Sequence, residues 1–117
     1  MSNTTAPNTT PQTICLTFYI HENRQHHHTL LYEWLLEQAK KNGIQGGSAF
    51  RAIAGFGRHG QLQEDHFFEL DGNLTIQVMF FVQEVEAALL LDLVERENIV
   101  LFYTRTPVDS GYTSLGH

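Results

Sequence analysis

The 117-residue sequence predicts an α+β protein of the split-βαβ, or ferredoxin-like, type with the element order βαββαβ. Two observations predict this fold. Four segments have the alternating pattern of strands, two have helical spacing, and each helical segment lies between two strands. The composition is globular, with 42% hydrophobic and 17% charged residues. Right-handed crossovers then place both helices on one face of a four-stranded antiparallel sheet.

The first half of the predicted domain contains a strand, a helix and a second strand. Residues 14–20 alternate and are rich in β-branched and aromatic side chains, so they predict a strand. Residues 50–56 form the second predicted strand. The helix between them has Thr29 as its expected N-cap and Asn42-Gly43 as its C-terminal stop. Its apolar positions at helical spacing are Leu30, Leu31, Trp34, Leu35 and Ala39.

The second half contains a loop, a strand, a helix and a last strand. Residues 57–65 are polar and predict a loop, followed by a short extended piece at 66–70 and a turn at 71–73. A strand over 74–82 should place Leu74, Ile76, Val78, Phe80 and Val82 on one face. A helix over 84–97 has Val85, Ala88, Leu89 and Val94 as its apolar positions. Residues 99–104 form the last predicted strand.

The second face of the predicted sheet is unusually apolar. It is expected to carry Tyr19, Ile53, Met79, Phe81 and Phe102. A face of this kind is not left in water, so we expect further copies of the same chain to cover it; the alternative is that the tails fold back over it. The predicted domain spans residues 13–106. We expect residues 1–12 to be a disordered tail and residues 107–117 to be a flexible tail, because both are rich in small polar residues.

Charge and cysteine content exclude several classes of protein. The net charge of −6 repels a phosphate backbone, so no nucleic-acid partner is expected. The single cysteine, Cys15, forms neither an internal disulfide nor a thiolate metal site.

No apolar run reaches the roughly 20 residues of a membrane span, so no direct membrane insertion is expected. The first residues lack a signal-peptide pattern, and we expect a cytoplasmic protein.

Two motifs indicate a known family. The segments Leu31-Tyr32-Glu33 and Arg51-Ala52-Ile53-Ala54-Gly55-Phe56-Gly57 resemble those of the bacterial "domain of unknown function 190" proteins, which belong to the PII-like superfamily. The resemblance covers roughly residues 14 to 105. It implies a ferredoxin-like subunit in a homotrimer whose sheets pack about a three-fold axis. It also implies a sensor or adaptor rather than an enzyme, because PII-like proteins bind nucleotides or small metabolites between subunits.

The resemblance further implies a protein partner. The sequence also departs from the PII pattern in one loop. Residues 58–66 occupy the place of the loop through which PII-like proteins contact a target such as a membrane transporter. PII signalling proteins themselves have a Gly- and Lys-rich phosphate-binding loop between the second helix and the last strand. Here that connection is Arg96-Glu97-Asn98, without glycine, so the backbone nest for phosphates is missing.

Residues 55–58 are the first candidate site, for a small anionic or nucleotide-like ligand. Gly55 and Gly57 permit close approach of a ligand on either side of Phe56, and Arg58 can pair with a phosphate or carboxylate. Arg51 and Arg105 are further cationic candidates. The alternative interpretation is a bend with Phe56 in the core and with arginines that are solvated or paired with acids.

The second candidate site is a histidine cluster. Imidazoles and a carboxylate suit zinc, copper or nickel, and the expected ligands are His21, Glu22, His26, His27 and His28. This hypothesis describes a metal-binding protein that resembles the CutA-type trimers. The competing interpretation is a solvated loop before the first helix. A small enzyme on the sheet face is the least favoured alternative, because no nucleophile elbow, P-loop or HExxH motif occurs. The sequence leaves any cofactor unknown.

Overall fold

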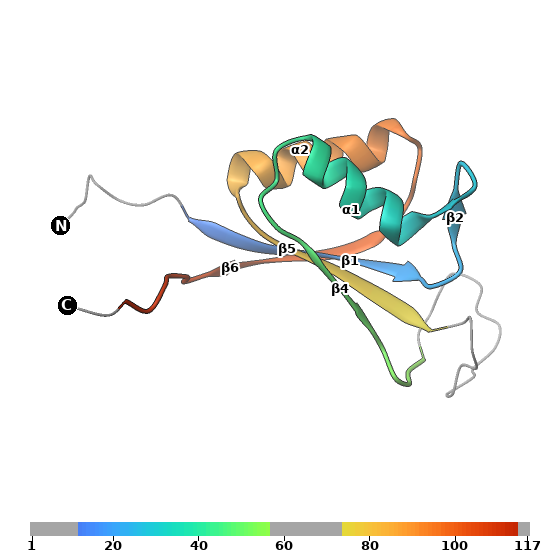
Figure 1. Cartoon of the computed structure of the whole chain (residues 1–117), viewed down its shortest axis with the longest axis horizontal. Helices are drawn as coiled ribbons and strands as arrows, with labels where there is room; N and C mark the ends of the chain where they lie inside the picture. The colour runs from blue at the N-terminus through green and yellow to red at the C-terminus, as the bar shows by residue number, and fades with distance from the viewer. Residues whose placement is uncertain (1–11, 57–73, 115–117) are drawn as a thin grey trace.

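The main sheet has four antiparallel strands in the order β4-β5-β1-β6, and both helices lie on one of its faces (Figure 1). The computed structural model of the chain describes residues 12–56 and 74–114. The elements follow the chain as β1 (Thr13–His21), β2 (Gln25–His26), β3 (Thr29–Leu30), α1 (Leu31–Lys41), β4 (Ser48–Arg51), β5 (Thr75–Gln83), α2 (Glu84–Arg96) and β6 (Phe102–Val108). The predicted ferredoxin-like class is therefore confirmed.

The core lies between the sheet and the helices. Strand β1 occupies an inner position and pairs with both β5 and β6. In register with β5, Phe18 lies opposite Val78 and Leu16 opposite Phe80, and all four side chains are buried. The five residues predicted to share one face of β5 are all buried, which confirms the predicted alternation; they are Leu74, Ile76, Val78, Phe80 and Val82.

Helix α1 packs on the sheet through Leu31, Leu35 and Ala39, and Trp34 is packed partly against the core. Its C-terminal stop is confirmed, because Gly43 follows the cap residue Asn42 with a φ of 88°. The predicted N-cap is wrong. Thr29 is paired in β3, and Leu30 occupies the N-cap position without a side-chain hydrogen bond. Thr29 belongs instead to the small β2–β3 hairpin, which the sequence does not predict.

Helix α2 begins with a capping box in which Gln83 and Glu86 bond reciprocally. Its buried residues are Ala87, Leu90, Leu93 and Val94. Of the predicted apolar face only Val94 is buried, whereas Val85, Ala88 and Leu89 are exposed. The segment contains so many consecutive apolar residues that the periodicity alone does not set the buried face. Neither described helix is long and apolar enough to cross a bilayer.

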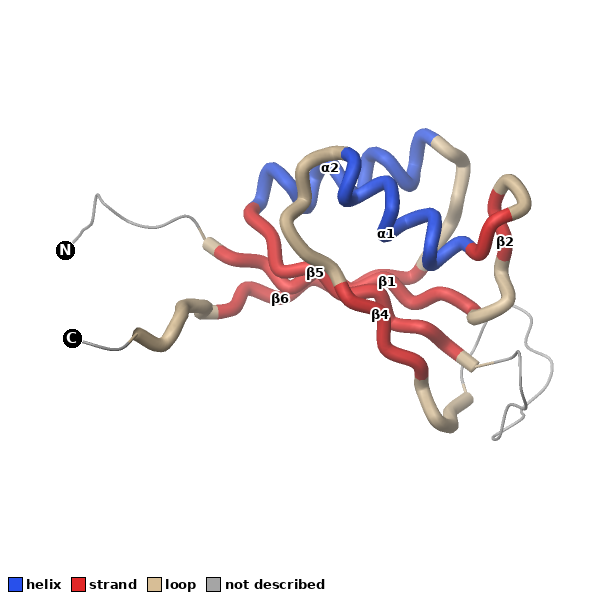
Figure 2. The backbone as a smooth tube through the Cα atoms, in the orientation of Figure 1, coloured by secondary structure: helices blue, strands red, loops and turns tan. Residues whose placement is uncertain are grey.

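The two edge strands differ from their predicted bounds. Strand β4 covers Ser48–Arg51 instead of 50–56, and β6 covers Phe102–Val108 instead of 99–104. Strand β6 includes Pro107, which an edge strand tolerates although proline cannot donate a ladder hydrogen bond. Figure 2 shows both edge strands beside the central pair. The predicted loop at 57–65, the extended piece at 66–70 and the turn at 71–73 lie outside the described residues.

Candidate functional site

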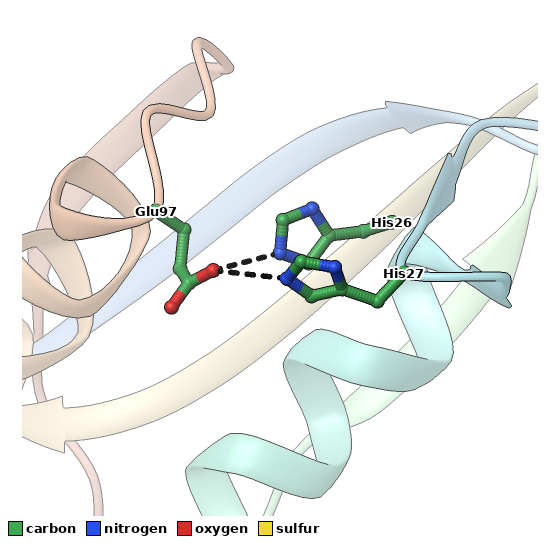
Figure 3. Close-up of side chains that lie close together, drawn as sticks. All are labelled: His26, His27 and Glu97. Atoms are coloured by element: carbon green, nitrogen blue, oxygen red, sulfur yellow. Dashed lines mark hydrogen bonds and ion pairs between the residues drawn. The ribbon is translucent and has the colours of Figure 1, made fainter.

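The β2–β3 hairpin brings two histidines against the C-terminal end of α2. Its strands pair Gln25 with Leu30 and His26 with Thr29, so His27 and His28 form a two-residue turn. Both turn residues have positive φ, 52° and 67°. A two-residue turn of this hand matches the twist of the strands, although asparagine and glycine usually occupy it. The turn points His27 toward α2, beside His26 (Figure 3).

A carboxylate from the far end of the sequence completes this group. The Nε2 atom of His26 lies 2.9 Å from Oε1 of Glu97, and Nε2 of His27 lies 3.5 Å from the same oxygen. The two imidazole rings are 4.0 Å apart between centroids. The ring of Trp34 on α1 meets His26 edge to face, with ring centroids 4.7 Å apart. We call His26, His27 and Glu97 the His–Glu cluster.

The backbone around Glu97 fixes where its side chain starts. Glu97 is the C-cap of α2, and Asn98 follows with a φ of 60°. The N–H of Asn98 donates to the carbonyl of Glu95, and the N–H of Ile99 donates to that of Val94. These two bonds are the Schellman arrangement that ends a helix, with asparagine in the place usually held by glycine. Asn98 thus adopts the left-handed conformation that glycine usually provides at the end of a helix.

Exposure and charge vary across the His–Glu cluster. The exposed fraction is 15% for the His26 side chain, 40% for Glu97 and 73% for His27. The cluster is therefore covered on the His26 side and open to water on the His27 side. The hydrogen bond from His26 lowers the pKa of the Glu97 carboxyl below its ordinary value, and the contact with His27 acts in the same direction. Glu97 is consequently a carboxylate at neutral pH.

The structure separates the five residues of the predicted metal site. His26 and His27 join Glu97, and each of the three offers a ligand atom within 4.8 Å of the others. Glu22 instead pairs with Arg51, with Nε and Oε1 2.6 Å apart. His21 ends β1 opposite Thr75 on β5, and His28 is an exposed turn residue. Glu97 is absent from the predicted set because no local pattern links it to a hairpin 70 residues earlier in the chain.

The candidates for an anion site are spread over the molecule. Arg51 is on β4 and Arg105 is on β6, which are the opposite edges of the sheet. Arg105 pairs with Glu84 at the start of α2, with Nη2 2.6 Å from Oε2. Gly55 and Phe56 follow β4 and are exposed, so Phe56 is not a core residue of this chain. Gly57 and Arg58 lie outside the described residues.

The sheet face that points away from the helices exposes several large aromatic side chains. It carries Phe81, Phe102 and Phe50, whose exposed fractions are 61%, 69% and 53%. Tyr19 contacts Phe102 across the β1–β6 pair, with ring centroids 5.3 Å apart. Phe50 takes the place predicted for Ile53, which lies beyond the end of β4. We call the residues on this side of the four strands the outer sheet face.

The α+β ferredoxin-like fold, with its helices on one face, defines the structural class of this protein. Residues 13–106 match the model of the domain of unknown function 190 family, described as "Uncharacterized ACR", and the chain belongs to this family, which is PII-like. It is also similar to a UPF0166 protein of Aquifex aeolicus (strain VF5). The two are 38% identical over 53 residues, which are 45% of this chain and 50% of the relative. The match thus spans about half of each protein.

Proposed function

We propose that the protein is a PII-like regulatory subunit that works as a homotrimer built on the outer sheet face. The observation that carries the proposal is the exposure of Phe50, Phe81 and Phe102 on one face. Removing one such side chain from water contributes about 1.5–3 kcal/mol. Several large apolar side chains exposed on one face of a sheet indicate an interaction site. PII-like proteins resemble this chain in fold, and in them the sheets pack together about a three-fold axis.

The charge pattern supports identical copies as the cover. Among the described strands, no residue of the outer sheet face is Asp, Glu, Lys or Arg. The two arginines on strands, Arg51 and Arg105, lie opposite the core residues Ile76 and Leu16 and so point to the helix side. A protein with a net charge of −6 can therefore meet itself on this face without placing like charges in contact.

Light scattering on the purified chain tests the assembly. The wild type should have three times the chain mass of 13.3 kDa at micromolar concentration. Phe81→Glu should give monomers, because an unpaired charge buried in the interface costs several kcal/mol. Val85→Glu is the matched control: Val85 is 73% exposed but lies on α2, so this variant should remain trimeric.

Two outcomes contradict the proposal. A wild-type protein that is monomeric at micromolar concentration would rule out the proposed trimer. A trimeric Phe81→Glu variant would show that the copies meet on another surface. Circular dichroism of each variant establishes that the fold is retained, so that a loss of mass reports assembly and not unfolding.

The ligand and partner form the second part of the proposed function. A small anionic or nucleotide-like ligand would bind between subunits near residues 55–58, and the 58–66 loop would contact a protein target, with a membrane transporter as one candidate class. Arg51 and Arg105 stand on opposite sheet edges, so only two different subunits could bring such edges together at one ligand. The role is regulatory and non-catalytic. Its expected place is the cytoplasm, which suits the free Cys15.

A further inference from the structure

We propose that the His–Glu cluster is a binding site for one divalent transition-metal ion of the zinc, nickel and copper class. The ion would join the β2–β3 hairpin to the C-terminal end of α2. The proposal rests on His26, His27 and Glu97 alone and does not depend on the trimer or on an anionic ligand.

The spacing of the three side chains fits such an ion. In a tetrahedral site with metal–ligand distances near 2.1 Å, two ligand atoms are about 3.4 Å apart. The Glu97 oxygen lies 2.9 Å from Nε2 of His26 and 3.5 Å from Nε2 of His27, values on either side of that separation. All three ligand atoms lie within 4.8 Å of one another, so modest side-chain adjustments would bring them around one ion.

The donor set indicates the kind of ion. Two imidazole nitrogens and one carboxylate oxygen suit zinc, nickel and copper, whereas magnesium and calcium take ligand sets made mainly of oxygen. Three protein ligands leave a fourth position for water or for an external group. That position lies on the open side of the cluster, since the side chain of His27 is 73% exposed.

A hydrogen bond explains only half of the arrangement. The 2.9 Å contact between His26 and Glu97 is an ordinary hydrogen bond, but the 3.5 Å contact from His27 is too long to add much stability. His27 nevertheless reaches Glu97 from a backbone with a φ of 52°, beside His28 at 67°. A residue other than glycine held in this conformation costs about 1 kcal/mol or more. The two-residue hairpin requires this conformation at both turn residues, and it places the imidazole of His27 beside Glu97.

The neighbouring residues hold the first ligand in place. The edge-to-face contact with Trp34 fixes the ring of His26, which is 15% exposed. The N–H of Leu31 donates to the carbonyl of Arg24 at 2.7 Å and ties the base of the hairpin to the start of α1. The metal would thus bridge a segment anchored on α1 and the cap of α2, two parts of the helical layer that are far apart in sequence.

Zinc titration by calorimetry, with cobalt absorption spectra as a second readout, tests the site on the full chain. The wild type should bind one zinc ion per chain at the cluster, and cobalt should give the intense visible bands of a tetrahedral ion. Glu97→Gln keeps a hydrogen-bond acceptor for His26 but loses the carboxylate, and it should weaken zinc binding at least about tenfold. His27→Gly removes an imidazole while glycine accepts the positive φ, and it should have a similar effect.

His28→Gly is the matched control, because His28 shares the turn and the conformation of His27 but is not part of the cluster. It should leave zinc affinity within about twofold of the wild type.

The chain has seven histidines, so Glu97→Gln is the decisive variant. If Glu97→Gln binds zinc as tightly as the wild type, or if the wild type does not bind, the proposal is wrong. Equal losses in His27→Gly and His28→Gly would also overturn it. The monomeric Phe81→Glu variant should retain full zinc affinity, which separates this test from that of the trimer.

Discussion

The carboxylate of Glu22 lies where the ends of three strands meet, and it is only 12% exposed. Nε of Arg51 donates to its Oε1 at 2.6 Å, and the backbone N–H of Leu74 donates to its Oε2 at 3.3 Å. The backbone N–H of Glu22 donates in turn to the carbonyl of Leu74 at 2.8 Å. Glu22 and Arg51, proposed from the sequence as a metal ligand and a ligand-binding cation, thus pair with each other in this chain.

This pair leads to a prediction at the residue scale. Arg51→Ala should lower the free energy of unfolding by about 1–3 kcal/mol, because a nearly buried carboxylate loses its cationic partner. Arg96→Ala is the comparison: Arg96 pairs with Asp92 one turn earlier on α2, and both side chains are more than 60% exposed. Its loss should cost no more than about 0.5 kcal/mol. Urea unfolding of the monomeric Phe81→Glu background measures both, and equal costs would contradict the role given to Glu22.

Both helices end in the same way, and this governs their stability as elements. In α1 the N–H of Gly43 donates to the carbonyl of Lys40, and the N–H of Ile44 donates to that of Ala39. In α2 Asn98 and Ile99 make the equivalent bonds. Ile44 and Ile99 are both buried, so each cap also directs an apolar side chain into the core. A helix that ends in this way fixes both its last carbonyls and the direction of the next segment.

The cap of α1 gives the prediction at the element scale. Gly43→Ala should destabilise the protein by about 1–2 kcal/mol, because the residue has a φ of 88° while an added Cβ would meet no atom within 4 Å. The cost is therefore one of backbone conformation. Gly46→Ala also meets no atom within 4 Å and has no positive φ, so it should be neutral or slightly stabilising. Thermal unfolding of the two variants measures the difference. If both lose the same stability, the cap is not the cause.

The elements also show what the sequence could predict. Strands β1 and β5 were placed within one residue at each end, because one of their faces is buried and imposes strict alternation. The edge strands β4 and β6 were misplaced, since most of their side chains are exposed and the pattern there is weak. The buried face of α2 was predicted wrongly, because apolar residues occur on several sides of this helix. For such segments the packing against the sheet, and not the periodicity, determines which side is buried.

The candidate sites show a different limit of prediction from the sequence. Two of the five proposed metal ligands, His26 and His27, do come together, because a short hairpin is a local structure. Their carboxylate partner comes from the connection after α2, and only the packing of α1 and α2 on one sheet brings it near. The hairpin itself escaped prediction because its turn is His-His and not Asn-Gly. Local spacing therefore predicts half of the cluster, and the tertiary fold supplies the rest.

At the scale of the whole molecule, the arginines of the described residues are already engaged. The chain has seven Lys and Arg residues against thirteen Asp and Glu. All four arginines of the described residues contact an oxygen of the same chain: Arg24 bonds to the carbonyl of Val100, and the others pair with Glu22, Asp92 and Glu84. Arg58, in the segment proposed for ligand binding, is the remaining arginine of the sequence.

This distribution gives the prediction for an anionic ligand. If an adenine nucleotide such as ADP raises the melting temperature, Arg58→Ala should weaken its binding roughly ten- to a hundredfold, because a charge-assisted contact contributes about 1.5–3 kcal/mol. Arg96→Ala removes the same charge from an exposed pair on α2 and should leave the affinity unchanged. Calorimetry with ADP on both variants, with light scattering to verify assembly, makes the measurement. No stabilisation by ADP, or equal affinity in both variants, would contradict a nucleotide site at residues 55–58.

The pairing of β1 with β6 has a consequence for how the chain is made. Thr13 lies opposite Val108, so the first and last described strands are neighbours in the sheet (Figure 1). During synthesis β1 leaves the ribosome early, but its second edge has no partner until β6 has followed. Over that interval an unpaired strand edge stands next to Tyr19 and Phe81 on the outer sheet face. Such long-range pairing folds slowly and exposes the nascent chain to aggregation. We therefore expect the nascent chain to need chaperones until β6 has been synthesised.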